Sequence, residues 1–322
     1  MEKQISYESV TEAGLQAGDN SGVIEAGAAQ TAKEPVTWRE FVRLAKPGII
    51  FSNSMTAFAG FWVASQWNIN WWLLISTLLG TALIMASGCV LNNYLDREMD
   101  TKMVRTQKRA LPSGRILPSV VLRYGIILGI LGVIVLYFLA GSALATLLGI
   151  IGLFVYVWIY TAWFKRTSVW STFVGSFSGA IPPVIGYCAV TGTMDAGAWI
   201  LFGILFLWQP PHFWALGIRR MEEYRAAGFP LLPVVKGTYL TKISMVRYVV
   251  LLVPVTVMLN VYGYVGHIYL FGATAMGLAW VIMSVAGFKA QDEVKWAKGM
   301  FIYSINYLTL MSILMVVDTV AS

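Results

Sequence analysis

Long apolar segments alternate with short polar ones along most of this chain. Nine of the segments approach the roughly 20 apolar residues that a membrane-spanning helix needs. They are residues 48–65, 71–94, 118–139, 143–163, 168–190, 198–218, 245–265, 268–287 and 298–317. The pattern predicts an all-α, polytopic membrane protein with nine transmembrane helices in a bundle.

The residues before the first span have a different character. Residues 1–36 are rich in Ala, Gly, Glu and Gln and contain few large apolar side chains. This composition predicts a disordered tail, and no apolar stretch typical of a secretory signal peptide occurs there. The predicted organisation is therefore a cytoplasmic tail over residues 1–36 and a transmembrane domain over residues 37–322.

The composition and charge pattern support a membrane protein. Hydrophobic residues make up 57% of the chain and charged residues only 12%, whereas soluble domains carry about 25% charged residues. The net charge of +7 does not indicate a nucleic acid partner, because all 23 Lys and Arg residues lie in the tail or at connections on one side of the spans. The positive-inside rule then predicts a cytoplasmic N-terminus and an outside C-terminus. Cys89 and Cys188 lie near opposite membrane faces in this topology, so no disulfide is expected.

Two connections on the basic side are long, at 95–117 and 219–244. Long connections in compact proteins are commonly functional. Proline pairs inside two spans, Pro182–Pro183 and Pro210–Pro211, predict local kinks. Chemistry is therefore expected at the cytoplasmic mouth of the bundle.

The second span ends in the sequence NNYLDREMD, residues 92–100. If the helix continues to its end, Asn92, Asp96 and Asp100 share one face, because residues four apart lie about one turn apart. Three oxygen donors suit Mg²⁺, which also binds substrate phosphates. The stretch is equally typical of a solvated helix end, in which Glu98 and Lys102 form an i,i+4 pair.

A basic cluster follows these acids in the sequence TKMVRTQKRALPSGR. It contains Arg105, Lys108, Arg109 and Arg115. Such side chains can bind a diphosphate and stabilise it as it leaves. The positive-inside rule alone also places basic residues here.

The sixth span and its connection form a second candidate region, WQPPHFWALGIRRMEEYRAAGFPLLPVVKG. Arg219 and Glu223 follow His212 by seven and eleven residues, so a continuous helix would place all three near one face. His212 lies within the hydrocarbon, where an ionisable residue indicates a function by default, although a packing role is the alternative. Glu222 and Glu223 either reach a second metal or balance neighbouring arginines. The turn-rich AAGFPLLP is expected to fold over the mouth as a lid.

These blocks resemble the intramembrane aromatic prenyltransferases of the UbiA superfamily, over about residues 37–317. The resemblance is carried by LAKPGIIFSN, ASGCVLNNYLDREMD with RTQKRAL, YTAWFKRTSVWSTFVGSFSGAIPPVIGYCAVTG, and WQPPHFWALGIRRMEEYRAAGFPLLPVVKG. The last two are similar to the haem-modifying branch of the superfamily. The resemblance implies nine helices around a central cavity that opens to the cytoplasmic side.

The resemblance also implies an activity. Farnesyl diphosphate and haem B would be the substrates, Mg²⁺ the cofactor, and haem O and diphosphate the products, after farnesyl transfer to a vinyl group and addition of water. The expected location is a bacterial cytoplasmic (inner) membrane. A haem A synthase or the assembly of a terminal oxidase would be the partner that receives the product.

Individual roles are expected from the residue patterns above together with this resemblance. The expected metal ligands are Asn92, Asp96 and Asp100. The expected catalytic residues are these three with Lys165 and Glu223. The diphosphate would be bound by Arg105, Lys108, Arg109 and Arg219, and the haem contacted by His212 and Tyr224. The second acidic motif of the superfamily is incomplete, since Ala227 fills its later acidic position, and a second Mg²⁺ is left open.

Two other functions fit parts of the pattern. One is prenylation of a different aromatic acceptor, such as a quinone precursor. The other is a multi-helix transporter, although transporters place their ionisable groups near the midplane, whereas the acids here cluster at one face.

Overall fold

The computed structural model describes residues 36–321, so the predicted tail lies, apart from its last residue, outside the described residues. The α-helices are α1 (Trp38–Ala45), α2 (Pro47–Ser65), α3 (Trp71–Asp100), α4 (Pro118–Ile134), α5 (Ala143–Phe154), α6 (Lys165–Thr167), α7 (Ser171–Gly179), α8 (Ile181–Thr191), α9 (Ala196–Arg219), α10 (Met221–Ala226), α11 (Leu232–Val261), α12 (His267–Ala286) and α13 (Glu293–Val317). Two π-helical segments, η1 (Val135–Leu139) and η2 (Val155–Phe164), and a 3₁₀ turn, η3 (Gly287–Lys289), complete them. Residues 36–321 contain no strand beyond one isolated bridge between Val265 and Thr319.

Eight helical segments within the described residues are long and apolar enough to cross a membrane. They match the second to ninth predicted spans. The first predicted span forms the 19-residue helix α2, but α2 is not among the eight because Ser52, Asn53 and Ser54 lower its hydropathy. The all-α membrane fold is confirmed, while a count of nine spans and a central cavity stay predictions.

Proline and glycine break the helices at some expected places and not at others. The fifth span divides into α7 and α8 at Ala180, because Pro182 and Pro183 lie in the first turn of α8. Helix α9, in contrast, continues through both of its prolines. The predicted connection 219–244 is largely helical, since α10 and the start of α11 lie within it. Gly237 interrupts α11 with a φ of 77°, a value that favours glycine.

Close helix packing depends on small residues. A Cβ added to Gly60 of α2 would lie 2.1 Å from the carbonyl oxygen of Pro183, and one added to Gly186 of α8 would lie 1.9 Å from that of Ala57. The two backbones therefore meet where no larger residue fits. Cys89 and Cys188 are both free and buried, as expected.

Segment η2 continues α5 with ten residues of π-helix. Such wide turns are rare and frequently occur at functional sites. Within η2 the rings of Tyr156 and Tyr160 stack with centroids 5.7 Å apart. Lys165 follows immediately at the start of α6, so η2 leads directly into that lysine.

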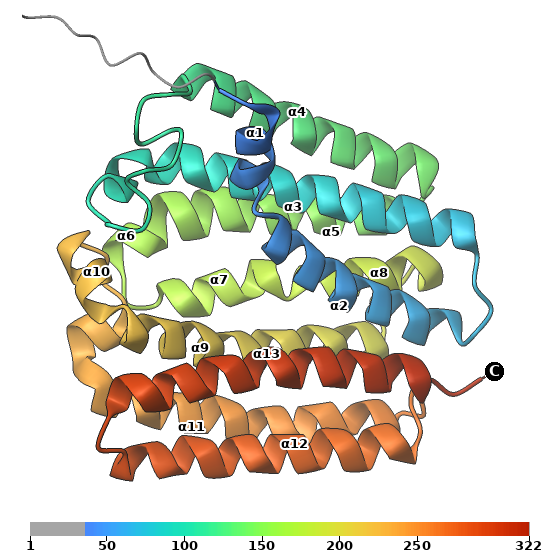
Figure 1. The fold of residues 1–322 in the computed structure, drawn as a ribbon. Helices are drawn as coiled ribbons and strands as arrows, with labels where there is room; N and C mark the ends of the chain where they lie inside the picture. Colours follow the sequence, from blue (N-terminus) through green and yellow to red (C-terminus); the bar gives the residue numbers. More distant parts are fainter. Residues whose placement is uncertain (1–35, 322) are drawn as a thin grey trace, which may run out of the picture. The chain divides into compact units, whose positions relative to one another are not determined.

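The 101–117 connection, α6 and α10 gather at one end of the helices (Figure 1). A small apolar cluster of Met103, Ala227 and Phe229 joins the connection after α3 to the turn after α10. At the same end α1 packs against α3 and α4, where the rings of Phe41 and Tyr124 lie 5.5 Å apart. The two predicted mouths are thus parts of one region.

Candidate functional site

Helix α3 brings its three predicted ligands onto one face. It remains helical to Asp100, and Asn92, Asp96 and Asp100 are all buried. The amide Nδ2 of Asn92 donates to Asp96 Oδ2 at 3.0 Å and to Thr161 Oγ1 of η2 at 3.2 Å. The shared face expected from the four-residue spacing is therefore present.

Basic residues from distant segments surround the two carboxylates. Lys165 Nζ forms an ion pair with Asp96, and Arg166 Nη2 lies 3.4 Å from its other oxygen. Arg109 Nη1 donates to Asp100 Oδ2 at 3.0 Å. Charge-assisted contacts of this kind are the stronger class of hydrogen bond. Both acids therefore have basic side chains from distant segments as direct partners.

Lys46, between α1 and α2, also reaches α3. Its Nζ donates to Asn92 Oδ1 at 2.8 Å, and burial lowers the pKa of this lysine from its ordinary value. Sequence reasoning missed Lys46, Arg166 and Thr161. Lys46 stands within LAKPGIIFSN and Arg166 within the haem-branch block, so the only available signal was their place in those blocks.

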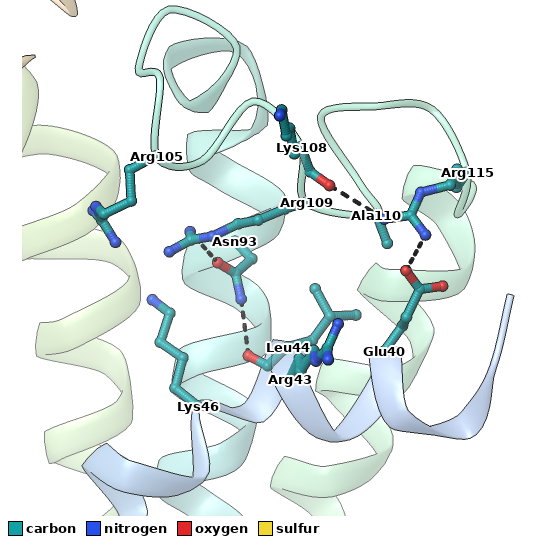
Figure 2. A pocket seen from close by; sticks show the side chains of 10 residues that line it. All are labelled: Glu40, Arg43, Leu44, Lys46, Asn93, Arg105, Lys108, Arg109, Ala110 and Arg115. Carbon is teal, nitrogen blue, oxygen red and sulfur yellow. Dashed lines mark hydrogen bonds and ion pairs between the residues drawn. The ribbon is translucent and has the colours of Figure 1, made fainter. Parts of the chain in front are cut away.

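A pocket of about 290 Å³ opens beside Asn93 (Figure 2). Six of its ten lining residues are basic: Arg43, Lys46, Arg105, Lys108, Arg109 and Arg115. The one lining acid, Glu40, pairs with Arg115. A cleft lined by one sign of charge attracts ligands of the opposite charge, so this pocket suits a multiply charged anion.

Three of the four predicted diphosphate residues, Arg105, Lys108 and Arg109, line this pocket. Arg219 does not. Its guanidinium lies 5.3 Å from the ring centre of Phe301 on α13. The structure therefore does not bring Arg219 together with the other three.

The end of the sixth span differs from the expected continuous helix. Helix α9 ends at Arg219, and Arg220 has a non-helical backbone (φ −124°, ψ 27°) before α10 begins. His212 and Arg219 do share a face, since both contact Phe301. The prediction that Glu223 lies on the same face of a continuous helix is wrong, because the helix breaks at Arg220. The carboxylate of Glu223 lies 3.4 Å from Arg220 Nη1 and 3.9 Å from Arg105 Nε.

The expected lid segment lies close to the first carboxylate. Lys165 Nζ is 5.0 Å from the ring centre of Phe229 while it pairs with Asp96. Tyr224 packs beside this ring, with centroids 6.2 Å apart. Tyr224 is thus placed at the α3 mouth, and none of the contacts recorded among residues 36–321 joins it to His212.

His212 lies between two aromatic rings. Trp208 and Phe301 stack on its faces, each with centroids 4.6 Å from the imidazole. His212 Nδ1 is 2.7 Å from Ser304 Oγ, whose single hydrogen donates to the carbonyl of Phe301 at 2.6 Å. With that hydroxyl hydrogen on Phe301, Nδ1 is the donor to Ser304, and a neutral imidazole then carries its lone pair on Nε2.

The donor set around α3 fits Mg²⁺ chemically. Two carboxylates and one amide oxygen are hard ligands, and both carboxylates already attract cationic side chains. Among residues 36–321 no group of three or more His, Cys, Asp or Glu is placed to hold a metal. A magnesium ion here would therefore complete its shell with water and phosphate oxygens, as it does in many phosphate sites.

Comparisons with known proteins find relatives over most of the chain. The UbiA prenyltransferase family matches residues 53–305. Protoheme IX farnesyltransferase 1 of Bacillus subtilis (strain 168) is 51% identical over 298 residues, covering 89% of this chain and 92% of that protein. Protoheme IX farnesyltransferase of Alkalihalophilus pseudofirmus is 46% identical over 306 residues, covering 93% and 96%.

Solved structures share the fold at lower identity. One, from work on the biosynthesis of digeranylgeranylglyceryl phosphate synthase in membranes, has a TM-score of 0.71 at 20% identity and covers 86% of this chain and 98% of its own. A UbiA homologue from Archaeoglobus fulgidus bound to GPP and Mg²⁺ has a TM-score of 0.64 at 15% identity, with coverage of 86% and 99%. These likenesses extend to the fold of nearly the whole chain.

Proposed function

Because this chain belongs to the UbiA prenyltransferase family, we propose that it transfers the farnesyl group of farnesyl diphosphate to a vinyl group of haem B. With addition of water, the products are haem O and diphosphate. The observation that carries the proposal is 51% identity, over 89% of the chain, to a protoheme IX farnesyltransferase. Membership of this family favours an enzyme over the transporter that the span pattern alone left open.

The acidic and basic groups at the end of α3 would drive departure of the leaving group. Mg²⁺ held by Asn92, Asp96 and Asp100 would supply positive charge to the diphosphate oxygens. Arg105, Lys108 and Arg109 point donors into the adjoining pocket, and Lys165 stands next to Asp96. These donors would stabilise the negative charge that develops as the bond from farnesyl carbon to diphosphate oxygen breaks.

The remaining steps need an apolar environment. The allylic cation left on the farnesyl group accepts the electron pair of the haem vinyl carbon, which forms the new carbon–carbon bond. Water then adds to the resulting cation and loses a proton, giving the hydroxyethylfarnesyl side chain. Apolar walls protect the first cation from early capture by water. The aromatic side chains along α9 and α13, including Trp208 and Phe301, are suited to this role.

Two residues are proposed to contact the haem. His212 has an Nε2 lone pair and is fixed by Ser304 and two stacked rings. An imidazole held in one tautomer is a common iron ligand. Tyr224, beside Phe229 at the mouth, would contact the porphyrin edge. Glu223, which links Arg220 to Arg105, would hold the two connections together during catalysis.

The chain is a multi-pass membrane protein, with eight apolar helices among its described residues. We place it in a bacterial cytoplasmic membrane, with the basic ends of its helices and the N-terminus inside and the C-terminus outside. The proposal is supported by the concentration of Lys and Arg on one side of the spans. A haem A synthase or an assembling terminal oxidase would then receive the product.

The activity is tested by offering purified protein in detergent farnesyl diphosphate with haem B or with 4-hydroxybenzoate. We expect a farnesylated haem only in the first reaction, identified by mass spectrometry. Prenylation of 4-hydroxybenzoate alone would reject the proposed acceptor. Treatment with EDTA should abolish turnover and added Mg²⁺ restore it; full activity after chelation would reject the metal.

A further inference from the structure

Lys46 has an unusual backbone. Its φ and ψ are 57° and 66°, in the left-handed region, and it ends α1 and precedes α2. A non-glycine residue is uncommon there, and such strained positions concentrate at functional sites. The conformation turns the chain between two helices and directs the side chain of Lys46 toward α3.

The ammonium of Lys46 determines how Asn92 is oriented. Lys46 Nζ donates to Asn92 Oδ1 at 2.8 Å, while Asn92 Nδ2 donates to Asp96 and Thr161. A lysine ammonium can only donate, so this contact requires the amide oxygen of Asn92 to face Lys46 and its amide nitrogen to face Asp96. An ammonium has three donors, and this is the single hydrogen bond recorded for it among residues 36–321.

The same side chain belongs to the basic pocket. Figure 2 shows the ends of Lys46, Arg105 and Arg109 turned toward one another beside Asn93. Asn93 connects the two walls, since it accepts from Arg109 Nη1 at 3.3 Å and donates to the carbonyl of Leu44 at 2.8 Å. The end of α1 is thereby fixed against α3 at the place where Lys46 enters the pocket.

We propose that Lys46 is a further substrate-binding residue, which completes the diphosphate site from the junction of α1 and α2 and orients Asn92. The inference rests on the proposed diphosphate chemistry, but not on the identity of the acceptor. Arg105, Lys108 and Arg109 come from the connection after α3, whereas Lys46 comes from the opposite wall of the pocket. Its two remaining donors can bind phosphate oxygens as a point charge.

The variant Lys46→Gly distinguishes the effect of the lysine charge from the effect of its left-handed backbone conformation. Glycine adopts the left-handed conformation without strain, so this variant keeps the turn between α1 and α2 while it loses the ammonium. Hydrogen bonds to charged groups contribute enough to change binding by about 10- to 100-fold. We therefore expect Lys46→Gly to keep its thermal unfolding temperature, while its Kd for inorganic diphosphate with Mg²⁺, measured by calorimetry on the full chain in detergent, rises at least about tenfold.

Further measurements separate a binding role from a general defect. The KM for farnesyl diphosphate should rise in parallel with that Kd, and the KM for haem B should not change. Lys46→Arg should recover most of the affinity. Lys298→Met, at an exposed position on α13, should match the parent.

A Kd for diphosphate in Lys46→Gly within twofold of the parent would overturn the proposal, as would an equal loss of affinity for haem B. If Lys46→Gly does not fold, Lys46→Asn takes its place, because asparagine also tolerates this backbone region. If the protein farnesylates no haem but loses diphosphate binding in these variants, the acceptor assignment fails and the role of Lys46 stands.

Discussion

The two acidic mouths of this protein are alike in composition and differ in structure. At the end of α3, the side chain of Asp96 is only 6% exposed and contacts Asn92, Lys165 and Arg166. At α10, the side chain of Glu223 is 32% exposed and that of Glu222 is 76% exposed. The basic partners of Asp96 lie 69 and 70 residues away in the chain, whereas Glu222 pairs with Arg225 one turn away.

This difference indicates that burial of the acidic side chains, and not the number of charged residues, distinguishes a preorganised site from a solvated one. Removing one member of a buried ion pair typically costs about 3–5 kcal/mol, because its partner stays charged and desolvated. Exposed pairs contribute about 0–1 kcal/mol. The α3 mouth should therefore respond strongly to single substitutions and the α10 mouth weakly.

The largest effect is expected for Asp96→Asn. It removes the charge that Lys165 and Arg166 contact and that would bind Mg²⁺, so haem O formation should fall by about 100-fold or more. The protein should still fold in the membrane, since the amide keeps an oxygen acceptor toward Lys165. Turnover is measured by chromatography of extracted haems, with Glu98→Gln, an exposed position on α3, as the control. Normal activity in Asp96→Asn would contradict the claim that the α3 mouth responds more strongly than the α10 mouth.

Lys165→Met tests the basic side of the same mouth. Losing this ammonium should raise the KM for farnesyl diphosphate by about 10- to 100-fold, because a charged donor to the leaving group is lost. Lys165→Arg should recover part of the loss, and Lys102→Met, at an exposed position, should change nothing. An unaltered KM in steady-state assays would mean that Lys165 only neutralises Asp96.

His212→Asn tests the part of the second candidate region that lies within the membrane-spanning helix α9. Asparagine can still donate to Ser304 but has no counterpart of Nε2, so the affinity for haem B should fall roughly tenfold and the Soret band of bound haem should shift. Phe213→Ala, at an exposed neighbouring position, is the control. An unchanged Soret band would show that His212 serves packing alone.

The smallest effect is expected for Glu223→Gln. Its contacts with Arg220 and Arg105 are 3.4 Å or longer and partly exposed, so turnover should fall only about two- to fivefold. Glu222→Gln should have no effect on the same assay. A loss in Glu223→Gln as large as that in Asp96→Asn would make the two mouths equivalent and contradict the comparison.

Local patterns in the sequence were sufficient for much of the fold and for one face of the site. Hydropathy located the helices, and the four-residue spacing of Asn92, Asp96 and Asp100 gave their shared face, because both depend on local helix geometry. Lys46 and Arg166 were missed because they approach α3 from 46 and 70 residues away in the chain. Such contacts are determined by tertiary packing.

The error at Glu223 has a different cause. Its predicted position relied on helical periodicity continuing to Glu223, and a single non-helical residue, Arg220, ended that periodicity. No glycine or proline marks the position, and the sequence gives no signal of the break. Site predictions that cross the end of a helix are therefore weaker than those that remain within one.

The ten-residue π-helix η2 makes the α3 mouth sensitive to chain length. A π-helix closes i→i+5 hydrogen bonds and is uncommon over more than a single turn. Deleting one residue between Val155 and Phe164 would rotate everything after it by about 100° around the helix axis. Lys165 would then face away from Asp96, so the loss of one residue here would separate the acidic and basic sides of the α3 mouth.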